Sequence, residues 1–151
     1  MGYCEIKDVI SMIKEDMINS IIGNEYIEDE DEQMKKINAL AETAISDADA
    51  EINGYLVKRY NVPFSSIPAV INKFSKDIAV YNLVSRAGID EGEREKTILN
   101  RYNAAIKYLE NVAKGIVDIG VKDNSATESA KIGFAMSSSN RIFSRDSMRG
   151  W

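Results

Sequence analysis

The chain has 151 residues and a mass of 16.8 kDa, which is enough for one domain with a substantial hydrophobic core. Hydrophobic residues make up 44% and charged residues 28% of the sequence, a balance typical of globular proteins that excludes a chain disordered throughout. The formal net charge is -5, and this acidic balance argues against a protein that grips nucleic acid through a basic surface.

The sequence contains no histidine and a single cysteine, Cys4. Without histidine the chain lacks Ser–His and Cys–His nucleophile pairs, histidine-ligated metals and the usual proton shuttle at neutral pH. A lone cysteine forms no internal disulfide, so we interpret Cys4 as a structural thiol. Neither a membrane-spanning run nor a secretory signal is apparent. We therefore expect a cytoplasmic protein with no enzyme activity, no cofactor, no metal site and no membrane partner.

The first element predicted is an amphipathic helix from about Glu5 to Asn19, followed by a break at Gly23. Residues 25–32 come next and contain six acidic side chains in eight positions. Because like charges repel in a packed element, this pattern predicts a loop. The loop leads into a helix and places its negative charges near the positive end of the helix dipole.

The second helix, from Met34 to about Val57, has the most regular pattern in the chain. Asp47, Asp49 and Glu51 lie within it and alternate like the ligands of a calcium loop. A helix turns successive side chains by about 100°, so we interpret them as a solvated face and not as a metal site. The apolar positions that keep a helical spacing are Ile37, Leu40, Ala41, Ala44, Ile45, Ala48, Ile52, Tyr55 and Leu56.

A third helix is predicted from Pro68 to about Ala87, with the proline in its first turn. It is apolar almost all round from Ile78 to Val84, so we expect it to be the most buried element. A fourth helix starts at about Glu93 and ends at Lys114–Gly115, where a glycine follows a cation in the last turn. The chain is therefore predicted to be all-α, a small antiparallel bundle of about four helices over residues 1–120.

Residues 121–151 form a C-terminal arm of different composition. The arm carries five Lys or Arg and three Asp or Glu side chains, so its charge is +2 and that of the preceding residues is -7. Residues 116–121 and 131–136 alternate apolar and polar side chains, which favours a short strand or hairpin when paired. Full burial of each large apolar side chain would gain roughly 1.5–3 kcal/mol, so we expect the arm to bind a partner. The candidate interface residues are Ile132, Phe134, Met136, Arg141, Ile142, Phe143, Arg145, Met148, Arg149 and Trp151.

Four segments together resemble a known family. They are AISDADAEINGYLVKRYNVPF (residues 44–64), IPAVINKFSKDIAVYNL (67–83), RYNAAIKYLENVAKG (101–115) and FSRDSMRGW (143–151). These segments are similar to the Mu-like branch of phage head–tail connector proteins, also called neck adaptor or head-completion proteins. The combination of A-E-I-x-G-Y-L-x-x-R-Y with the V-A-K-G stop and the terminal F-S-R-D carries the resemblance.

The resemblance implies a helical adaptor without catalytic activity or cofactor, assembled as a dodecameric ring beneath the portal protein. It implies a place in the virion neck after synthesis in the host cytoplasm, with a tail-side neck or tail terminator protein as a second partner. DNA would pass through the ring without specific binding, and an acidic wall suits such a channel because it repels phosphates. The acidic loop itself is not part of the resemblance, and three interpretations of it stay open: a channel wall, a weak site for a hard cation and a solvated loop. Its candidate channel-facing residues are Glu28, Asp29, Glu30, Asp31 and Glu32.

A second hypothesis comes from another functional class. The chain would be a monomeric helical regulatory or interaction module whose arm folds back on its own bundle. A free arm should be cut by proteases near Ser125 or Ser137, whereas a folded-back arm should resist cleavage.

Overall fold

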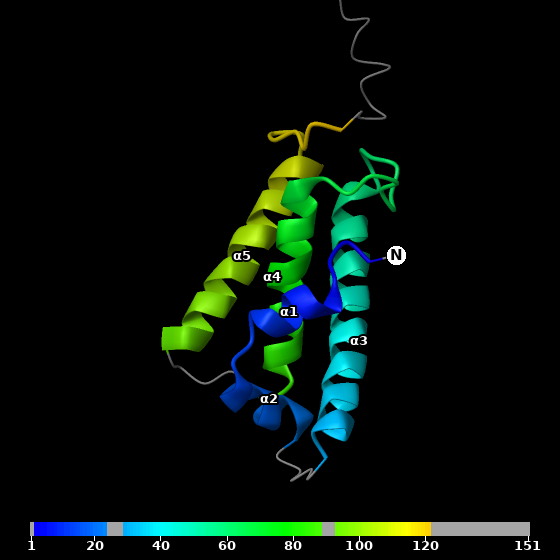
Figure 1. Cartoon of the computed structure of the whole chain (residues 1–151). Helices are drawn as coiled ribbons and strands as arrows, with labels where there is room; N and C mark the ends of the chain where they lie inside the picture. The colour runs from blue at the N-terminus through cyan, green and yellow to red at the C-terminus, as the bar shows by residue number, and fades with distance from the viewer. Residues whose placement is uncertain (1, 24–28, 89–92, 122–151) are drawn as a thin grey trace, which may run out of the picture.

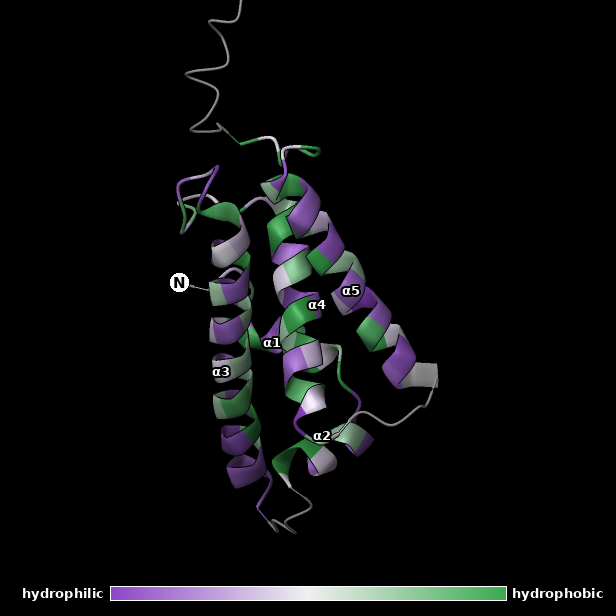
Figure 2. Cartoon of the chain, turned by 180° about the vertical axis from the view of Figure 1, so that it is seen from behind, coloured by the Kyte–Doolittle hydropathy of each residue, from purple (hydrophilic) through white to green (hydrophobic). Residues whose placement is uncertain are grey.

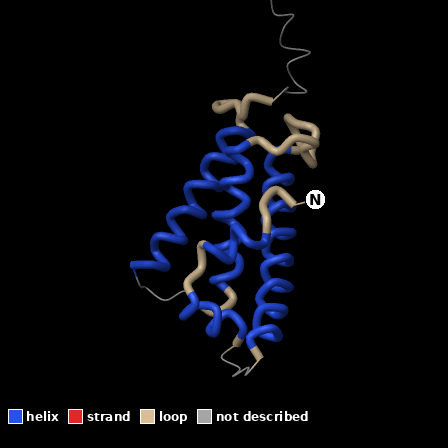
Figure 3. Tube along the Cα trace, viewed as in Figure 1, coloured by secondary structure: helices blue, strands red, loops and turns tan. Residues whose placement is uncertain are grey.

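A computed structural model describes residues 2–23, 29–88 and 93–121 of the chain. These residues contain five helices and no strand, so the predicted all-α bundle is confirmed (Figures 1 and 3). The long helices α3, α4 and α5 pack against one another, and the short helices α1 and α2 contact both α3 and α4. The helices are α1 (Ile6–Ser11), α2 (Glu15–Ile22), α3 (Glu30–Leu56), α4 (Ala69–Ser85) and α5 (Glu93–Ala113).

The N-terminal region holds two helices, so the prediction of a single helix from Glu5 to Asn19 is wrong. The chain is extended at Lys14, where φ is -84° and ψ is 153°, and α2 starts at the next residue. The change of direction lets Val9 and Ile21 both reach the core, with 0% and 6% of their surface exposed. The interruption contains neither glycine nor proline, and the apolar positions keep a helical spacing across it, so the sequence does not reveal it. At Gly23 α2 ends as predicted, with φ at 100°.

Helix α3 confirms the strongest sequence pattern, but it begins one turn earlier than predicted. The Asp29 carboxylate accepts a hydrogen bond from the Asp31 backbone N–H at 3.0 Å and so caps the helix. The predicted loop over residues 25–32 is therefore wrong from Glu30 onward, because acidic side chains stabilise a helix at its positive end. The start of α3 is accordingly hydrophilic (Figure 2). Its buried residues are Ile37, Ala41, Ala44, Ile45, Ala48, Ile52 and Leu56.

Helix α4 lies between α3 and α5 and forms the centre of the bundle (Figure 1). Nine of its 17 residues are buried, against seven of the 27 in α3, as its apolar sequence predicts. Pro68 stands at the N-cap position, one residue before the predicted place in the first turn. The described helices include none with the length and apolar character that a membrane span requires.

Helix α5 ends at the predicted glycine stop. The backbone N–H of Gly115 donates to the Val112 carbonyl at 3.0 Å, and that of Ile116 donates to the Asn111 carbonyl at 2.9 Å. These two bonds form a Schellman motif, which requires the left-handed backbone that Gly115 adopts at φ 79°. The glycine thus turns the chain out of α5 and toward residues 116–121.

Residues 116–121 form no strand here, where the paired strand that the prediction requires is absent from the described residues. They run as an irregular, bent segment across the end of the bundle. The alternation still sets which side chains face inward. Val117, Ile119 and Val121 pack against the core, whereas Ile116 is 71% exposed. The second predicted strand, over residues 131–136, lies outside the described residues.

Candidate functional site

The structure places only part of the candidate site predicted from the sequence. Asp29 caps α3, and Glu30, Asp31 and Glu32 lie exposed in its first turn. Whether these carboxylates face a channel stays a prediction. Glu28 and the ten candidate arm residues lie outside the described residues: Ile132, Phe134, Met136, Arg141, Ile142, Phe143, Arg145, Met148, Arg149 and Trp151. Two described regions therefore bear on function. One is residues 115–121, which lead into the arm and which we call the root of the arm. The other is the surface of the helical body, where the arm or a partner can dock.

The root of the arm is fastened to the bundle by Arg59. This residue lies in the linker after α3, at the same end of the molecule as the end of α5 (Figure 1). Its Nη1 donates a hydrogen bond to the Val112 carbonyl at 2.7 Å and lies 3.5 Å from the Val117 carbonyl. The guanidinium also lies 5.5 Å from the ring centroid of buried Tyr60. The Val112 carbonyl thus accepts a second hydrogen bond besides that from the Gly115 N–H, and the cation complements the negative end of the helix dipole.

Substitution Arg59→Met should loosen this junction. We expect a loss of about 1–2 kcal/mol in the free energy of unfolding, because a charged hydrogen bond and a helix-dipole interaction disappear together. Amide hydrogen exchange of residues 115–121 should accelerate more than that of α4. Arg59→Lys keeps the charge but lacks the planar guanidinium, so its exchange rate at residues 115–121 should lie between those of the wild type and Arg59→Met. Unchanged exchange at residues 115–121 in Arg59→Met would show that other contacts hold the root of the arm.

The N-terminal segment before α1 is locked between α3 and α4. The Tyr3 backbone N–H donates to Asp49 Oδ2 at 2.9 Å, and the Tyr3 carbonyl accepts from Asn72 Nδ2 at 2.7 Å. The Tyr3 hydroxyl donates to Asn53 Oδ1 and accepts from the Phe64 N–H at 3.4 Å. Tyr3 is only 2% exposed, so residues outside any helix form part of the core. The sequence pattern gave no sign of this, because a single tyrosine has no periodicity.

Asp49 joins this segment to α4. Its Oδ1 accepts a hydrogen bond from the Ser75 hydroxyl at 2.9 Å. Burial raises the pKa of the Asp49 carboxyl, and the bonds from Tyr3 and Ser75 oppose that rise. Cys4 Sγ lies 3.3 Å from the same hydroxyl, and burial raises the pKa of the thiol. A buried thiol with a raised pKa is a weak nucleophile, which agrees with a structural role for Cys4.

The three alternating acidic residues of α3 point to three different surroundings. Asp47 is exposed, Asp49 serves the N-terminal segment, and Glu51 accepts a hydrogen bond from the Tyr102 hydroxyl at 3.2 Å. Burial and then the Glu51 charge raise the pKa of Tyr102 to about 12. The interpretation of these residues as a solvated face is therefore correct only for Asp47. Among the described residues no group of histidine, cysteine or acidic side chains is arranged to hold a metal ion.

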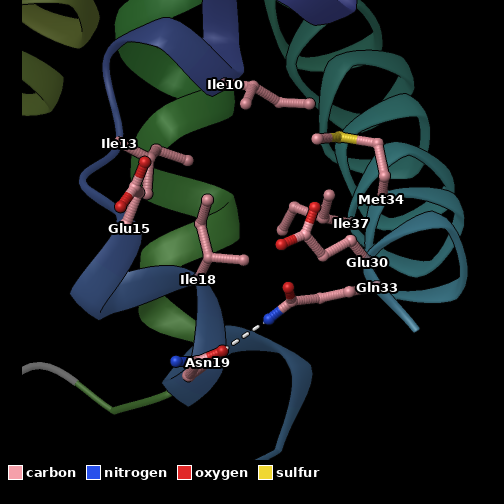
Figure 4. A pocket seen from close by; sticks show the side chains of 9 residues that line it. All are labelled: Ile10, Ile13, Glu15, Ile18, Asn19, Glu30, Gln33, Met34 and Ile37. Carbon is pink, nitrogen blue, oxygen red and sulfur yellow. Dashed lines mark hydrogen bonds between the residues drawn. The ribbon is translucent and has the colours of Figure 1, made fainter. Parts of the chain in front are cut away.

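A hollow of about 550 Å³ lies between α2 and the start of α3 (Figure 4). Ile13 and Ile18 form one wall, and Met34 and Ile37 of α3 face them from the other side. Ile10 lies above the two walls (Figure 4). Five of the nine lining side chains are thus apolar, and the Met34 side chain is 52% exposed.

Polar groups rim the same hollow. Gln33 Nε2 donates to Asn19 Oδ1 at 2.6 Å and links α3 to α2 at its lower edge (Figure 4). Glu15 and Glu30 stand on the two sides, and both are exposed. An apolar lining with a carboxylate on each side suits a partner that carries apolar and cationic side chains together.

Comparison with known proteins decides the family. Residues 3–138 match the family described as Bacteriophage Mu, Gp36. The chain belongs to this family. The match begins at Tyr3, at the locked N-terminal segment of this Gp36-family protein, and continues beyond the Gly115 stop into the arm. It therefore covers the helical body and the first part of the arm.

Two curated relatives are similar to this Gp36-family protein. The Mu-like prophage FluMu protein gp36 of Haemophilus influenzae is 29% identical over 113 residues, which span 75% of this chain and 76% of the relative. Gene product J of Escherichia phage Mu is 30% identical over 89 residues, and the alignment spans 59% of each protein. The chain is thus a Mu-like phage protein, and its family supports a structural or morphogenetic role.

Proposed function

We propose that this protein is a head–tail connector of a Mu-like phage, a structural subunit without catalytic activity. Its copies form a ring, expected to be dodecameric, beneath the portal protein in the virion neck and join the capsid to the tail. The family match from residue 3 to residue 138 is the observation that carries the proposal, because it includes the body and the start of the arm. The resemblance of the four segments to connector proteins adds the specific role.

The charge distribution supports the channel part of this proposal. The residues before the arm carry a net charge of -7, and the exposed carboxylates of Glu30, Asp31 and Glu32 gather at one end of α3. DNA that slides through a tube is held back least by walls that repel phosphates. We propose that the start of α3 faces this channel and that DNA makes no specific contact with it.

The arm supports the docking part. A closed ring needs a heterologous interface, in which one face of a subunit meets a different face of the next. Arginine and aromatic side chains are enriched in protein interfaces, and residues 141–151 hold three arginines, one phenylalanine and the tryptophan. We propose that the helical bodies pack side by side while the arm reaches the portal. A tail-side neck or tail terminator protein would then bind the opposite face of the ring.

Electron microscopy of the chain mixed with the portal protein of the same phage tests the proposal. Class averages should show a second ring stacked on the portal ring, with one connector subunit per portal subunit. The portal alone provides the control for the extra density. Portal rings that stay bare at a large excess of the chain would contradict the proposal.

The surface hollow beside α3 favours one alternative function. The protein would be a monomeric helical regulatory module whose arm folds back on its own bundle. An isolated chain cannot separate the two functions, because a subunit can wait as a monomer before assembly. The mixture with the portal separates the two functions, because a regulatory module would remain monomeric in the presence of the portal.

A further inference from the structure

Four adjoining hollows run along one side of α3. The first is the hollow between α2 and α3, and each later one shares lining residues with the one before it. Ile10 and Met34 join the first to the second, Ile6 joins the second to the third, and Glu42 joins the third to the fourth. We call this continuous surface, from Glu30 to Asn53 of α3, the α3 groove. It is about 35 Å long at 1.5 Å per helical residue.

The α3 groove is both apolar and acidic. Ile6 and Ile10 are half-buried in it, and Met34 is 52% exposed, one of three large apolar side chains so exposed in the described chain. The charged side chains along it are Glu5, Lys7, Glu15, Glu30, Glu42 and Asp49. The single cation among them is paired, since Lys7 Nζ lies 2.6 Å from the Glu5 carboxylate. An occupant with apolar and cationic side chains would therefore complement the groove.

The arm of this chain has the complementary composition. Residues 141–151 read RIFSRDSMRGW and hold three arginines, one aspartate and four large apolar side chains. We propose that this segment occupies the α3 groove of its own chain before assembly. The arginines pair with the carboxylates along the groove, and the apolar side chains cover Met34 and its aliphatic neighbours.

Chain length and direction favour the protein's own arm over that of a second copy. The arm leaves the described structure at Val121, at the end of the bundle where α3 ends, and the apolar hollow lies at the opposite end (Figure 1). Residues 122–140 reach up to about 60 Å when extended, which exceeds the length of the groove. A tethered segment within reach of its site acts at an effective concentration of about millimolar. A second copy at micromolar concentration competes poorly with it.

Docking in the groove would regulate the proposed function. The same arginine and apolar side chains cannot cover the α3 groove and a portal surface together, so the portal must displace the arm. This consequence rests on the proposed connector role, whereas the docking itself does not.

The fluorescence of Trp151 tests directly whether the arm is docked, because Trp151 is the only tryptophan of the chain and all tryptophan emission comes from it. Its fluorescence in the full-length protein should be blue-shifted and poorly quenched by acrylamide, equally at low and high protein concentration. Met34→Glu, which adds a charge to the groove, should raise quenching severalfold toward that of free tryptophan. Val57→Glu is the matched control, because Val57 is 65% exposed and lies outside the groove. Circular dichroism checks that both variants keep their helices, and Glu30→Lys offers a second groove variant.

Three results would overturn the assignment. Full quenching of Trp151 in the wild-type protein would show that the arm end is undocked. Protection that survives both Met34→Glu and Glu30→Lys would place the tryptophan on another surface. Protection that appears only at high protein concentration would assign the groove to the arm of a second copy. None of these measurements contains the portal, so failure of the connector proposal would leave their interpretation intact.

Discussion

Deletion of residues 143–151 is expected to abolish co-sedimentation of the protein with its portal. The deletion removes Phe143, Met148 and Trp151, and full burial of three such side chains contributes roughly 4–9 kcal/mol. Each 1.4 kcal/mol is a tenfold change in affinity, so binding should weaken by about a hundredfold or more even after ordering costs. The deleted segment lies beyond Val121, so the helices should keep their circular dichroism, and any fall in unfolding temperature would reflect loss of the arm from the α3 groove.

A control for this deletion comes from the arm itself. Replacement of Ser137, Ser138 and Ser139 by glycine changes the arm without touching an apolar or charged side chain, and binding should stay close to that of the wild type. Phe143→Ala and Trp151→Ala measure the two aromatic contributions separately. Undiminished co-sedimentation of the truncated protein would refute docking through the arm and move the portal contact to the helical body.

The long helices could be predicted from the sequence because their burial follows a single period. In α3 the apolar residues from Ile37 to Leu56 lie along the side that packs on the other helices, and seven of the nine predicted positions are buried. In α4 the apolar side chains point in several directions, and all of them can be buried because α4 contacts each of the other four helices. A period reports the direction in which a side chain points, and in a long helix that direction decides burial.

The same reasoning fails where tertiary packing overrides the local pattern. The break at Lys14 separates two apolar sets that keep a helical spacing across it, so only the contacts of α1 and α2 reveal it. Val117, Ile119 and Val121 alternate as a strand would, yet they pack on the end of a helical bundle. Strand pairing needs a partner, and the sequence of one segment does not show whether one is present.

The polar part of the structure could not be read from residue types. Asp49 and Glu51 look like surface carboxylates in the sequence, but their oxygens accept hydrogen bonds from residues 46 and 51 positions away along the chain. Arg59 and Tyr60 belonged to the motif that carried the family resemblance, and no chemical role was apparent for them. The structure shows that Arg59 bonds the linker after α3 to the end of α5, and that Tyr60 is buried with its ring beside the guanidinium. Long-range hydrogen bonds leave no periodic trace, so their donors and acceptors emerge only with the fold.

Substitution Tyr3→Ala should destabilise the protein more than any change on the exposed helix faces. The Tyr3 ring is 2% exposed and lies 5.8 Å from the Phe64 ring, and its hydroxyl bonds to α3 and to the linker before α4. Removal of a buried aromatic ring costs about 3–5 kcal/mol, a large share of the 5–15 kcal/mol that typically holds a domain folded. Urea unfolding followed by circular dichroism measures the loss.

Two matched variants separate the causes of that loss. Tyr3→Phe keeps the ring and removes the hydroxyl, so it should cost about 1 kcal/mol, the net value of one hydrogen-bonded group. Val57→Ala alters an exposed side chain and should change the free energy of unfolding by less than about 0.5 kcal/mol. A cost below about 1 kcal/mol for Tyr3→Ala would mean that the N-terminal segment is not locked in solution. The α3 groove would then lose the wall that Gly2 and Cys4 provide, so this measurement also bears on where the arm can dock.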